Sequence, residues 1–527
     1  MTTHPAGTLP AASAGADAAS PARSWIDDFW FARPLRRVAA IPLGTFGMLA
    51  SIIMTLASFG GGATRSHGGV LVALRLAFFQ YGHGAAIANV SLLIGTILFV
   101  LAWVRLGQRV IRGGIGDDAA SMSALNRICL KWVGPLLFAG PFMSRDIYSY
   151  LMQGALLGKG FDPYTQGAAF NPGPYLVEVS PDWRNTTTPY GPLHLWIGKI
   201  ITSIVGDNIT AGLFLYKLVS LAGFAVLVYA VPRIASHLGA SPSFALWIGV
   251  LNPLMVFHLV GGMHNEAVMV SLTCLGILLA LRGRILGGIA VIAVAMSLKA
   301  TAAFVLPFVV WYAVARREGS KNKALAFLGY GAAGAVITVA ILWAITWASG
   351  SNFGWIAALT GNTKVINPLA FPSFVTSSIG LVASVWTDTF PYNSLLGVVR
   401  EASMVIMGLG MIGCWWYFRK SELAATRGMI GAYIFAFVFN SVTLPWYYAS
   451  IISLIGTVRP RPWMQKLATG FSIIVAMAFT GGGNHQLYNI VWMTIAILGA
   501  WWAVQWIFHG SVDKRKQAEA ETATGVE

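Results

Sequence analysis

Long apolar runs dominate this chain and restrict what it can fold into. Segments of the length that an α-helix needs to cross a bilayer follow one another from about residue 39 to residue 508. Only 10% of the 527 residues are charged, whereas a soluble protein carries about a quarter. So few charges cannot cover a water-exposed surface. We therefore expect an all-α integral membrane protein whose main solvent is lipid.

The apolar runs divide into thirteen or fourteen predicted membrane-spanning helices. The count stays open because 285–315 can be divided differently and because 446–458 is short for a span. The predicted spans are 39–60, 85–105, 129–143, 209–231, 243–261, 266–281, 285–298, 301–315, 324–349, 394–418, 428–444, 446–458, 467–481 and 487–508.

The basic residues indicate how these spans are oriented. If the N-terminus lies inside, nearly every cluster of Lys and Arg between spans falls on the cytoplasmic side, as the positive-inside rule requires. We therefore predict a multi-pass protein of the plasma membrane. The net charge of +16 does not indicate nucleic-acid binding, because no basic stripe alternates with aromatic residues in a soluble module. The clusters lie around Arg33–Arg37, Arg105–Arg112, Arg282–Arg284, Arg316–Lys323, Arg419–Lys420, Arg459–Lys466 and Lys514–Lys516.

Both ends of the chain differ in composition from the apolar body. We predict a disordered cytoplasmic N-terminal segment over 1–38, a polytopic membrane domain over 39–508 and a disordered cytoplasmic tail over 509–527. The N-terminal segment is rich in Ala, Ser, Pro and Gly and lacks the order of a secretory signal. The cysteines are interpreted as small packing residues, since their spacing matches no metal or redox motif: Cys129, Cys274 and Cys414.

The predicted orientation sends most of the polar chemistry to the extracytoplasmic side. Residues of the types Asp, Asn, His and Tyr occur in the long loop 144–208 and in the turn 261–266. Some of these types also occur in segments 350–393, 443–448 and 481–485. Within the long loop, apolar residues at helical spacing predict an interfacial helix over 146–158 and a second amphipathic stretch over 193–204. A long loop with this content is typical of a functional site.

Two charged residues stand out at this face. Asp146 directly follows a predicted span, and an ionised carboxylate beside hydrocarbon is a functional candidate because its placement is costly. A first-turn carboxylate that satisfies helix amides is the alternative. Lys299 lies between two apolar stretches on the outer side, against the positive-inside bias, which favours phosphate binding. The alternative for Lys299 is a lysine that snorkels from a helix end.

The turn between two spans carries His264, Asn265 and Glu266, which can hold sugar hydroxyls or orient an acceptor. Helix capping, with Asn265 as the cap and Glu266 in the first turn, is the alternative. Outer aromatic residues can stack on sugars or line a lipid groove, although an interfacial aromatic belt explains each one singly. These residues are Tyr150, Tyr164, Tyr190, Trp446 and Tyr447.

No zinc motif occurs, and the outer carboxylates Asp162 and Asp182 are too far apart in sequence to form a metal motif. We therefore predict no metal site and no cofactor, while a divalent ion stays open.

The order of the motifs resembles one family of membrane enzymes. Asp146-x-x-x-Tyr150, Gly160-x-Asp162-Pro163-Tyr164 and Thr188-Pro189-Tyr190-Gly191-Pro192-Leu193 are similar to the first outer loop of GT-C glycosyltransferases that use polyprenyl-phosphate mannose. Gly262–Glu266, Ser297–Ala300 and Pro445–Tyr447 extend the resemblance over most of the membrane body. The best match within that superfamily is the alpha-1,6-mannosyltransferases of lipomannan synthesis, the MptA/MptB type.

This resemblance implies a GT-C fold with a catalytic outer loop and a role in building lipomannan and lipoarabinomannan of the cell envelope. The implied reaction moves mannose from polyprenyl-phosphate-mannose to a lipid-anchored mannan acceptor, forming an alpha-1,6 linkage with inversion. Asp146 would then act as general base, and Lys299 and Arg145 would bind the donor phosphate. Pairing with Asp146 is the alternative for Arg145. The partners are the lipid donor, the mannan acceptor and membrane lipids.

Two other functions compete with this one. A GT-C transferase of another sugar, such as arabinose, aminoarabinose or glucose, would keep the same architecture. A polyprenol-lipid transporter or flippase would instead show repeated halves and polar groups at the midplane. The chain shows no convincing internal repeat, and its polar residues crowd on one side.

Overall fold

The computed structural model describes residues 40–361 and 366–509, with side chains omitted at 359–361. The chain from Leu43 onward forms one compact unit, separate from the unit that ends at Pro42. The terminal segments predicted to be disordered, 1–38 and 509–527, lie outside the described residues except for His509.

Within the described ranges the secondary structure is helical, apart from one isolated bridge between Phe479 and His485, so the predicted all-α class is confirmed. The first half contains α2 (Leu43–Gly61), α3 (Val70–Ala73), α4 (Gly82–Ile111), α5 (Ala119–Val133), α6 (Asp146–Gly158), α7 (Pro174–Glu178), α8 (Pro192–Val205), α9 (Ile209–His237), α10 (Pro242–Gly249), α11 (Pro253–Met255), α12 (Glu266–Leu281) and α13 (Ile285–Leu298).

The second half contains α14 (Leu306–Ala315), α15 (Ser320–Ser349), α16 (Trp355–Gly361), α17 (Phe371–Ala383), α18 (Tyr392–Tyr417), α19 (Glu422–Phe439), α20 (Ala449–Ile455), α21 (Pro462–Met477) and α22 (Ile490–Phe508). The connections include a π-helix η6 (Val256–Gly261) and the 3-10 helices η2 (Ala77–Gln80), η3 (Gly134–Phe138), η4 (Ala168–Phe170), η5 (Pro181–Trp183), η7 (Ala300–Val305), η8 (Pro445–Tyr448) and η9 (Gly456–Val458).

Seven of the described helices are long and apolar enough to cross a membrane: α2, α4, α9, α15, α18, α19 and α22. An eighth span arises if Pro242–Gly249 and Pro253–Gly261, which meet at 50°, are taken together. Full-length helices therefore do not reach the predicted thirteen or fourteen spans. Several predicted segments are shorter apolar helices instead, because Pro and Gly interrupt them, as Pro135 does after α5.

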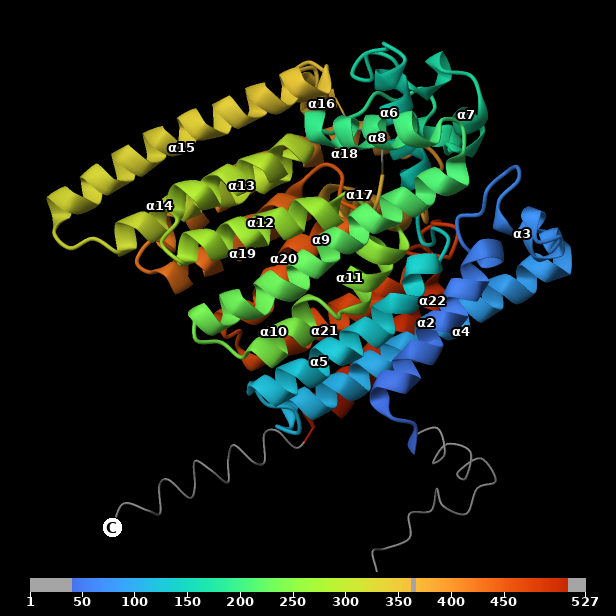
Figure 1. Ribbon diagram of the computed structural model, residues 1–527, viewed down its shortest axis with the longest axis horizontal. Coiled ribbons are helices and arrows are strands. Elements are labelled where there is room, and N and C mark those ends of the chain that lie inside the picture. Colours follow the sequence, from blue (N-terminus) through green and yellow to red (C-terminus); the bar gives the residue numbers. More distant parts are fainter. Residues whose placement is uncertain (1–39, 362–365, 510–527) are drawn as a thin grey trace, which may run out of the picture. The chain divides into compact units, whose positions relative to one another are not determined.

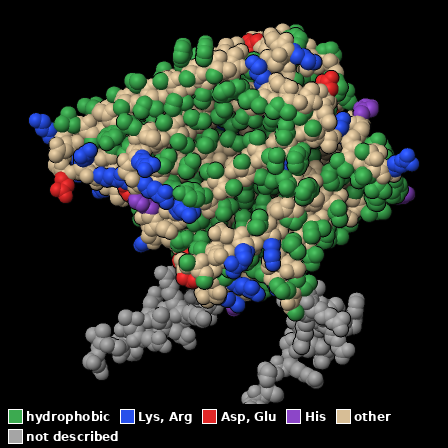
Figure 2. Space-filling view, in the orientation of Figure 1, with side chains coloured by type: hydrophobic (Ala, Val, Ile, Leu, Met, Phe, Trp, Pro, Cys, Tyr) green, Lys and Arg blue, Asp and Glu red, His purple; other side chains and the backbone are tan. Residues whose placement is uncertain are grey.

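The helices pack as a bundle whose two ends differ. In the described unit α2 packs on α4, α12 packs on both α9 and α13, and α18 packs on α19. Figure 1 shows α6, α7, α8 and α16 gathered at one end, at the upper right, away from the α14–α15 connection with its basic residues. Figure 2 shows hydrophobic side chains over most of the same face. Large side chains such as Trp343, Trp347 and Trp501 are exposed, as expected for a surface in contact with lipid.

The predicted amphipathic helices of the long loop are both present, as α6 and α8. Helix α6 ends at Gly158, and the chain reverses through Gly160, whose φ of +85° favours glycine. Helix α8 starts with Pro192, a residue suited to the first helical turn. The two helices approach closely because Gly154 has no side chain. A Cβ at this position would lie 2.1 Å from the carbonyl carbon of Gly198. These helices form a packed platform at the end of the bundle.

The chain between α10 and α12 brings a second polar turn under this platform. Asn252 caps the restart of the helix after the break by accepting a hydrogen bond from the Leu254 amide at 2.9 Å. The π-helix η6 then ends at Gly261, and Met263 adopts a φ of +54° in the turn that follows. His264, Asn265 and Glu266 are thereby placed at the start of α12, inside the protein.

Candidate active site

A cavity of about 50 Å³ adjoins the start of α6. Residues from three separate stretches line it, so it exists only in the folded chain. Four of the predicted site residues are among them, namely Asp146, Tyr150, Tyr190 and Tyr447. The remaining lining residues are Ser149, Gln153, Trp183, Thr186, Thr187, Pro189, Val442 and Leu444.

Asp146 is the carboxylate of this cavity, and 17% of its side chain is exposed. Its backbone amide donates to the Ser144 hydroxyl oxygen at 3.1 Å. Burial and the nearby Glu266 carboxylate raise the pKa of Asp146 to about 6, although Lys299 and hydrogen bonds from Ser144 and Tyr150 oppose the rise. A carboxyl group with this pKa is still largely ionised at neutral pH and accepts a proton more readily than an ordinary aspartate.

His264 lies against Asp146, with its Nδ1 at 3.7 Å from the carboxylate Oδ2. The Tyr150 hydroxyl is 3.3 Å from the same nitrogen, and Trp446 stacks on the imidazole with ring centroids 3.5 Å apart. Burial lowers the pKa of His264 well below its ordinary value, so the ring is neutral. The predicted residues His264, Tyr150 and Trp446 therefore form one wall behind Asp146.

Lys299 supplies the positive charge near the cavity. It stands between α13 and η7, is buried, and forms an ion pair with Glu266. Its Nζ also lies 3.9 Å from the ring centroid of Tyr447 and 5.4 Å from that of Tyr190. Burial pulls the pKa of Lys299 down, but the Glu266 carboxylate more than offsets this, so the group stays charged. A buried ion pair rather than snorkelling explains this lysine.

Asn265 joins the turn to the long loop through a chain of hydrogen bonds. Its amide nitrogen donates to His194 Nδ1 at 3.2 Å, and His194 Nε2 donates to Gln153 Oε1 at 2.9 Å. Thr188 donates to the same Gln153 oxygen at 3.2 Å. The Asn265 side chain makes no capping bond to α12, so the capping alternative does not apply to it.

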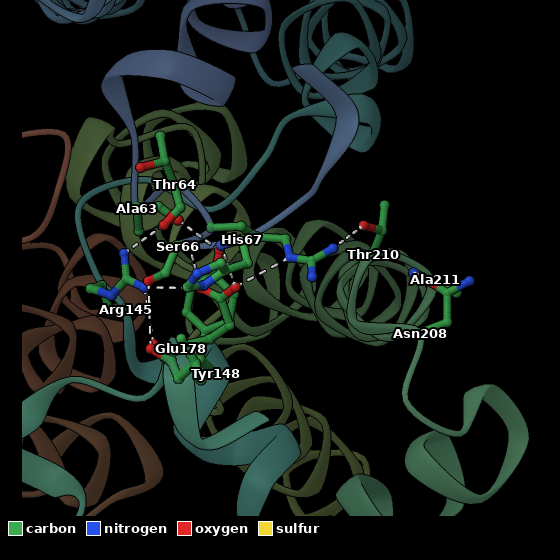
Figure 3. Close-up of polar contacts among 12 residues, drawn as sticks. Ala63, Thr64, Ser66, His67, Arg145, Tyr148, Glu178, Asn208, Thr210 and Ala211 are labelled. Atoms are coloured by element: carbon green, nitrogen blue, oxygen red, sulfur yellow. Dashed lines mark hydrogen bonds and ion pairs between the residues drawn. The ribbon is translucent and has the colours of Figure 1, made fainter. Parts of the chain in front are cut away.

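Arg145, predicted beside Lys299 as a phosphate ligand, belongs to a different cluster. Its guanidinium donates to the Thr64 carbonyl oxygen at 2.6 Å and to the Glu178 backbone oxygen at 3.0 Å, and it lies 3.4 Å from the Glu178 carboxylate (Figure 3). It also covers the ring of Tyr148. In this arrangement Arg145 anchors the loop, and its binding of phosphate stays a prediction.

Tyr164 is also apart from the cavity, because it packs with Leu157, Leu195 and Trp355 at the far end of α6. Sequence reasoning missed Gln153, His194 and Glu178. Gln153 follows Asp146 and Tyr150 at helical spacing, which places it on their face of α6 and could have identified it. His194 and Glu178 gave no such signal. Among the described residues, no group of three or more His, Cys, Asp or Glu side chains could hold a metal ion.

Most of the chain is similar in sequence to known proteins. The profile of the alpha-(1->6)-mannopyranosyltransferase N-terminal domain matches residues 44–315, and that of the MptB C-terminal domain matches residues 375–509. The chain is 55% identical to alpha-(1->6)-mannopyranosyltransferase A of Corynebacterium glutamicum, over 86% of this chain and 96% of that protein. It is 36% identical to alpha-(1->6)-mannopyranosyltransferase A of Mycobacterium tuberculosis, over 89% and 90% of the two chains.

The N-terminal profile covers the cavity residues from Asp146 to Tyr190, and the C-terminal profile covers Val442, Leu444 and Tyr447. The chain is therefore a multi-pass membrane glycosyltransferase that belongs to the alpha-(1->6)-mannopyranosyltransferase family of the MptA/MptB type.

Proposed function

We propose that this protein transfers mannose from polyprenyl-phosphate-mannose to a lipid-anchored mannan acceptor, with Asp146 as general base and with inversion at the anomeric carbon. The observation that carries the proposal is the partly exposed Asp146 carboxylate, whose pKa is raised to about 6 and which lies on the cavity between the loop and the turn. The names of the relatives support the sugar and the linkage.

The reaction needs one direct displacement. The 6-hydroxyl oxygen of the acceptor attacks the anomeric carbon of the donor, and Asp146 accepts the hydroxyl proton as the new bond forms. The bond between the anomeric carbon and the phosphate oxygen breaks, and the polyprenyl phosphate leaves with its electron pair. A beta-linked donor gives an alpha-linked product by this route, with no covalent enzyme intermediate.

Lys299 is the group suited to the departing phosphate. Its ammonium is preorganised by Glu266 and by the faces of Tyr447 and Tyr190, so little reorganisation is needed when negative charge develops beside it. Tyr150, Tyr190 and Tyr447 line the cavity and offer ring faces and hydroxyls to sugars. His264, Trp446 and Asn265 hold this wall in place from behind.

We further propose that the site faces the extracytoplasmic side of the plasma membrane. Helices α6, α7 and α8 gather at one end of the bundle, while the basic connections α12–α13 and α14–α15 lie toward the other (Figure 1). The positive-inside rule assigns the basic end to the cytoplasm. A lipid donor would then enter from the membrane, and a growing mannan would approach from outside.

The test is transfer by the purified protein in nanodiscs. The donor is radiolabelled polyprenyl-phosphate-mannose, the acceptor is a short alpha-1,6-mannoside with a hydrophobic tag, and linkage is read by exomannosidase digestion and NMR. We expect alpha-1,6-linked product from wild type and none from Asp146→Asn. Polyprenyl-phosphate arabinose and glucose are offered in parallel. Preferred use of either donor, or cysteine labelling that places residue 146 in the cytosol, would overturn the proposal.

A further inference from the structure

A second and larger cavity, of about 410 Å³, lies on the other side of the loop platform from the Asp146 cavity. It is bounded by α2, the η3 segment and the first turns of α9, and its lining is mostly apolar. The two cavities share no lining residue: Tyr148 of α6 lines the larger one, and Tyr150 lines the smaller one. The larger cavity therefore has no direct access to the proposed base.

Lys217 of α9 lines this cavity, and only 1% of its surface is exposed. Its Nζ donates to the Val260 carbonyl oxygen at 2.6 Å, which uses one of the three N–H groups of an ammonium. None of the described carboxylates forms an ion pair with it. A buried lysine without a counter-anion is costly to keep charged inside a membrane protein, so an anion bound in the cavity would stabilise its ammonium form.

The polar end of the cavity carries further positive charge. Arg65 lines it and donates to the Thr210 hydroxyl oxygen at 2.9 Å, at the start of α9. Arg65 shares one carboxylate, Glu178, with Arg145 (Figure 3). Arg65 and Arg145 thus share the single Glu178 carboxylate, while Lys217, which lines the same cavity as Arg65, has no ion pair with a described carboxylate.

The opposite side of the cavity opens toward lipid. Leu56, Phe138 and Phe214 line it and are exposed large hydrophobic residues on the membrane-facing surface. Lys217 stands about 12 Å along the axis from the first residue of α9, at the 1.5 Å rise of an α-helix. With headgroup layers of about 5–7 Å, an α9 that starts at the membrane surface places the Lys217 Cα about 5 Å inside the hydrocarbon, from where the long side chain can reach toward the headgroups. An occupant with an anionic head and apolar chains fits such a cavity.

We propose that this cavity binds one anionic phospholipid of the bilayer. The phosphate is held between Lys217 and Arg65, and the acyl chains leave past Leu56, Phe138 and Phe214. The lipid is not a substrate, because the cavity is separate from that of Asp146. The bound lipid would stabilise the Asp146 site through two links that lie outside its cavity. Lys217 donates to the carbonyl of Val260, which precedes the His264 turn. Arg65 shares the Glu178 carboxylate with Arg145, which precedes Asp146.

The experiment compares lipid retention by native mass spectrometry. Full-length protein is exchanged into detergent with equal concentrations of phosphatidylglycerol and phosphatidylcholine of the same acyl chains. We expect wild type to retain one phosphatidylglycerol with about a fivefold preference over phosphatidylcholine. Lys217→Met removes the charge, keeps an unbranched side chain that is one atom shorter, and should abolish the preference. The matched control is Lys199→Met, because Lys199 also donates to a backbone carbonyl, that of Ser349, but does not line the cavity.

The variant Lys217→Arg and a photoreactive phosphatidylglycerol test the proposal independently of Lys217→Met. If Lys217→Met does not fold, Lys217→Arg should fold and keep the preference. A photoreactive phosphatidylglycerol should then label peptides of α2 and α9 in wild type. Equal retention of both lipids by wild type, an unchanged preference in Lys217→Met, or labelling elsewhere would each overturn the proposal. Displacement of phosphatidylglycerol by stoichiometric polyprenyl monophosphate would overturn the assignment to a phospholipid. None of these outcomes depends on transferase activity.

Discussion

The carboxylates of Asp146, the first residue of α6, and Glu178, the last residue of α7, differ in exposure and in the donors around them. Glu178 is 1% exposed and accepts from Arg65, from Arg145 and from the backbone amides of Ser66, at 2.7 Å, and His67, at 3.3 Å. Asp146 is partly exposed, faces a cavity, and has no arginine or lysine within ion-pair distance among the described residues. Glu178 therefore already accepts hydrogen bonds from four donor groups, whereas Asp146 can still accept a proton from a molecule in its cavity.

The difference shows which carboxylate can do chemistry. The Glu178 oxygens are occupied by two guanidinium groups and two backbone amides and do not line the Asp146 cavity. A partly desolvated carboxylate near a second negative charge holds a proton more readily. Glu178 thus fixes the loop, and Asp146 remains available to a substrate hydroxyl.

The largest expected effect comes from Asp146→Asn. The amide keeps the shape of the side chain but cannot accept the acceptor proton, so turnover should fall ~10²–10⁴-fold. Donor affinity and unfolding temperature should stay close to those of wild type, because the residue makes few structural contacts. Mannose transfer and isothermal titration with a donor analogue measure the two effects. Normal turnover in this variant would end the proposed role of Asp146.

Glu178→Gln should show the reverse pattern. Removing one partner from a buried ionic cluster leaves the guanidinium groups uncompensated and should lower stability by about 3 kcal/mol. The thermal unfolding midpoint in nanodiscs measures the loss. Turnover per folded molecule should change far less than in Asp146→Asn. Equal loss of turnover in both variants would contradict the division between a structural and a chemical carboxylate.

Lys299 should affect the donor rather than the base. Its removal alone leaves Glu266 buried and unpaired, so the informative variant is the double change Lys299→Met with Glu266→Gln, compared with Glu266→Gln alone. We expect donor affinity to weaken by about tenfold relative to the single variant, since one charged contact to phosphate is lost. Equal donor affinity in the two variants would exclude Lys299 as the phosphate ligand.

The pH profile of the wild type gives the most specific test, because it needs no substitution. Because the pKa of Asp146 is about 6, its base form predominates above that pH, and protonation below it should reduce kcat/KM tenfold per pH unit. Steady-state kinetics from about 1.5 pH units below this pKa to about 2 units above it should place the midpoint of the acid limb near 6. The profile of Glu178→Gln should keep this midpoint. A midpoint near the ordinary value of an aspartate would contradict the environment described for Asp146.

Much of the platform could be predicted from the chain itself. The apolar spacing over 146–158 and 193–204 and the glycine and proline punctuation correspond to α6 and α8 almost residue by residue. The number of full-length spans could not be predicted, because hydropathy alone does not show where a helix breaks, as at Asn252. The resemblance implied phosphate binding by Arg145, yet Arg145 precedes the first residue of α6 and its guanidinium turns toward Glu178, a partner that only the folded loop brings near.

The sequence by itself determined the solvent and the class of this protein, because hydrocarbon admits only apolar helices whose backbone groups bond internally. It also determined where polar residues concentrate. Only the tertiary structure decided which of them meet: Asp146 with His264, Glu266 with Lys299, and Glu178 with two arginines. These pairs join residues far apart in sequence, and their distances depend on how helices pack and where they break, which no local pattern encodes.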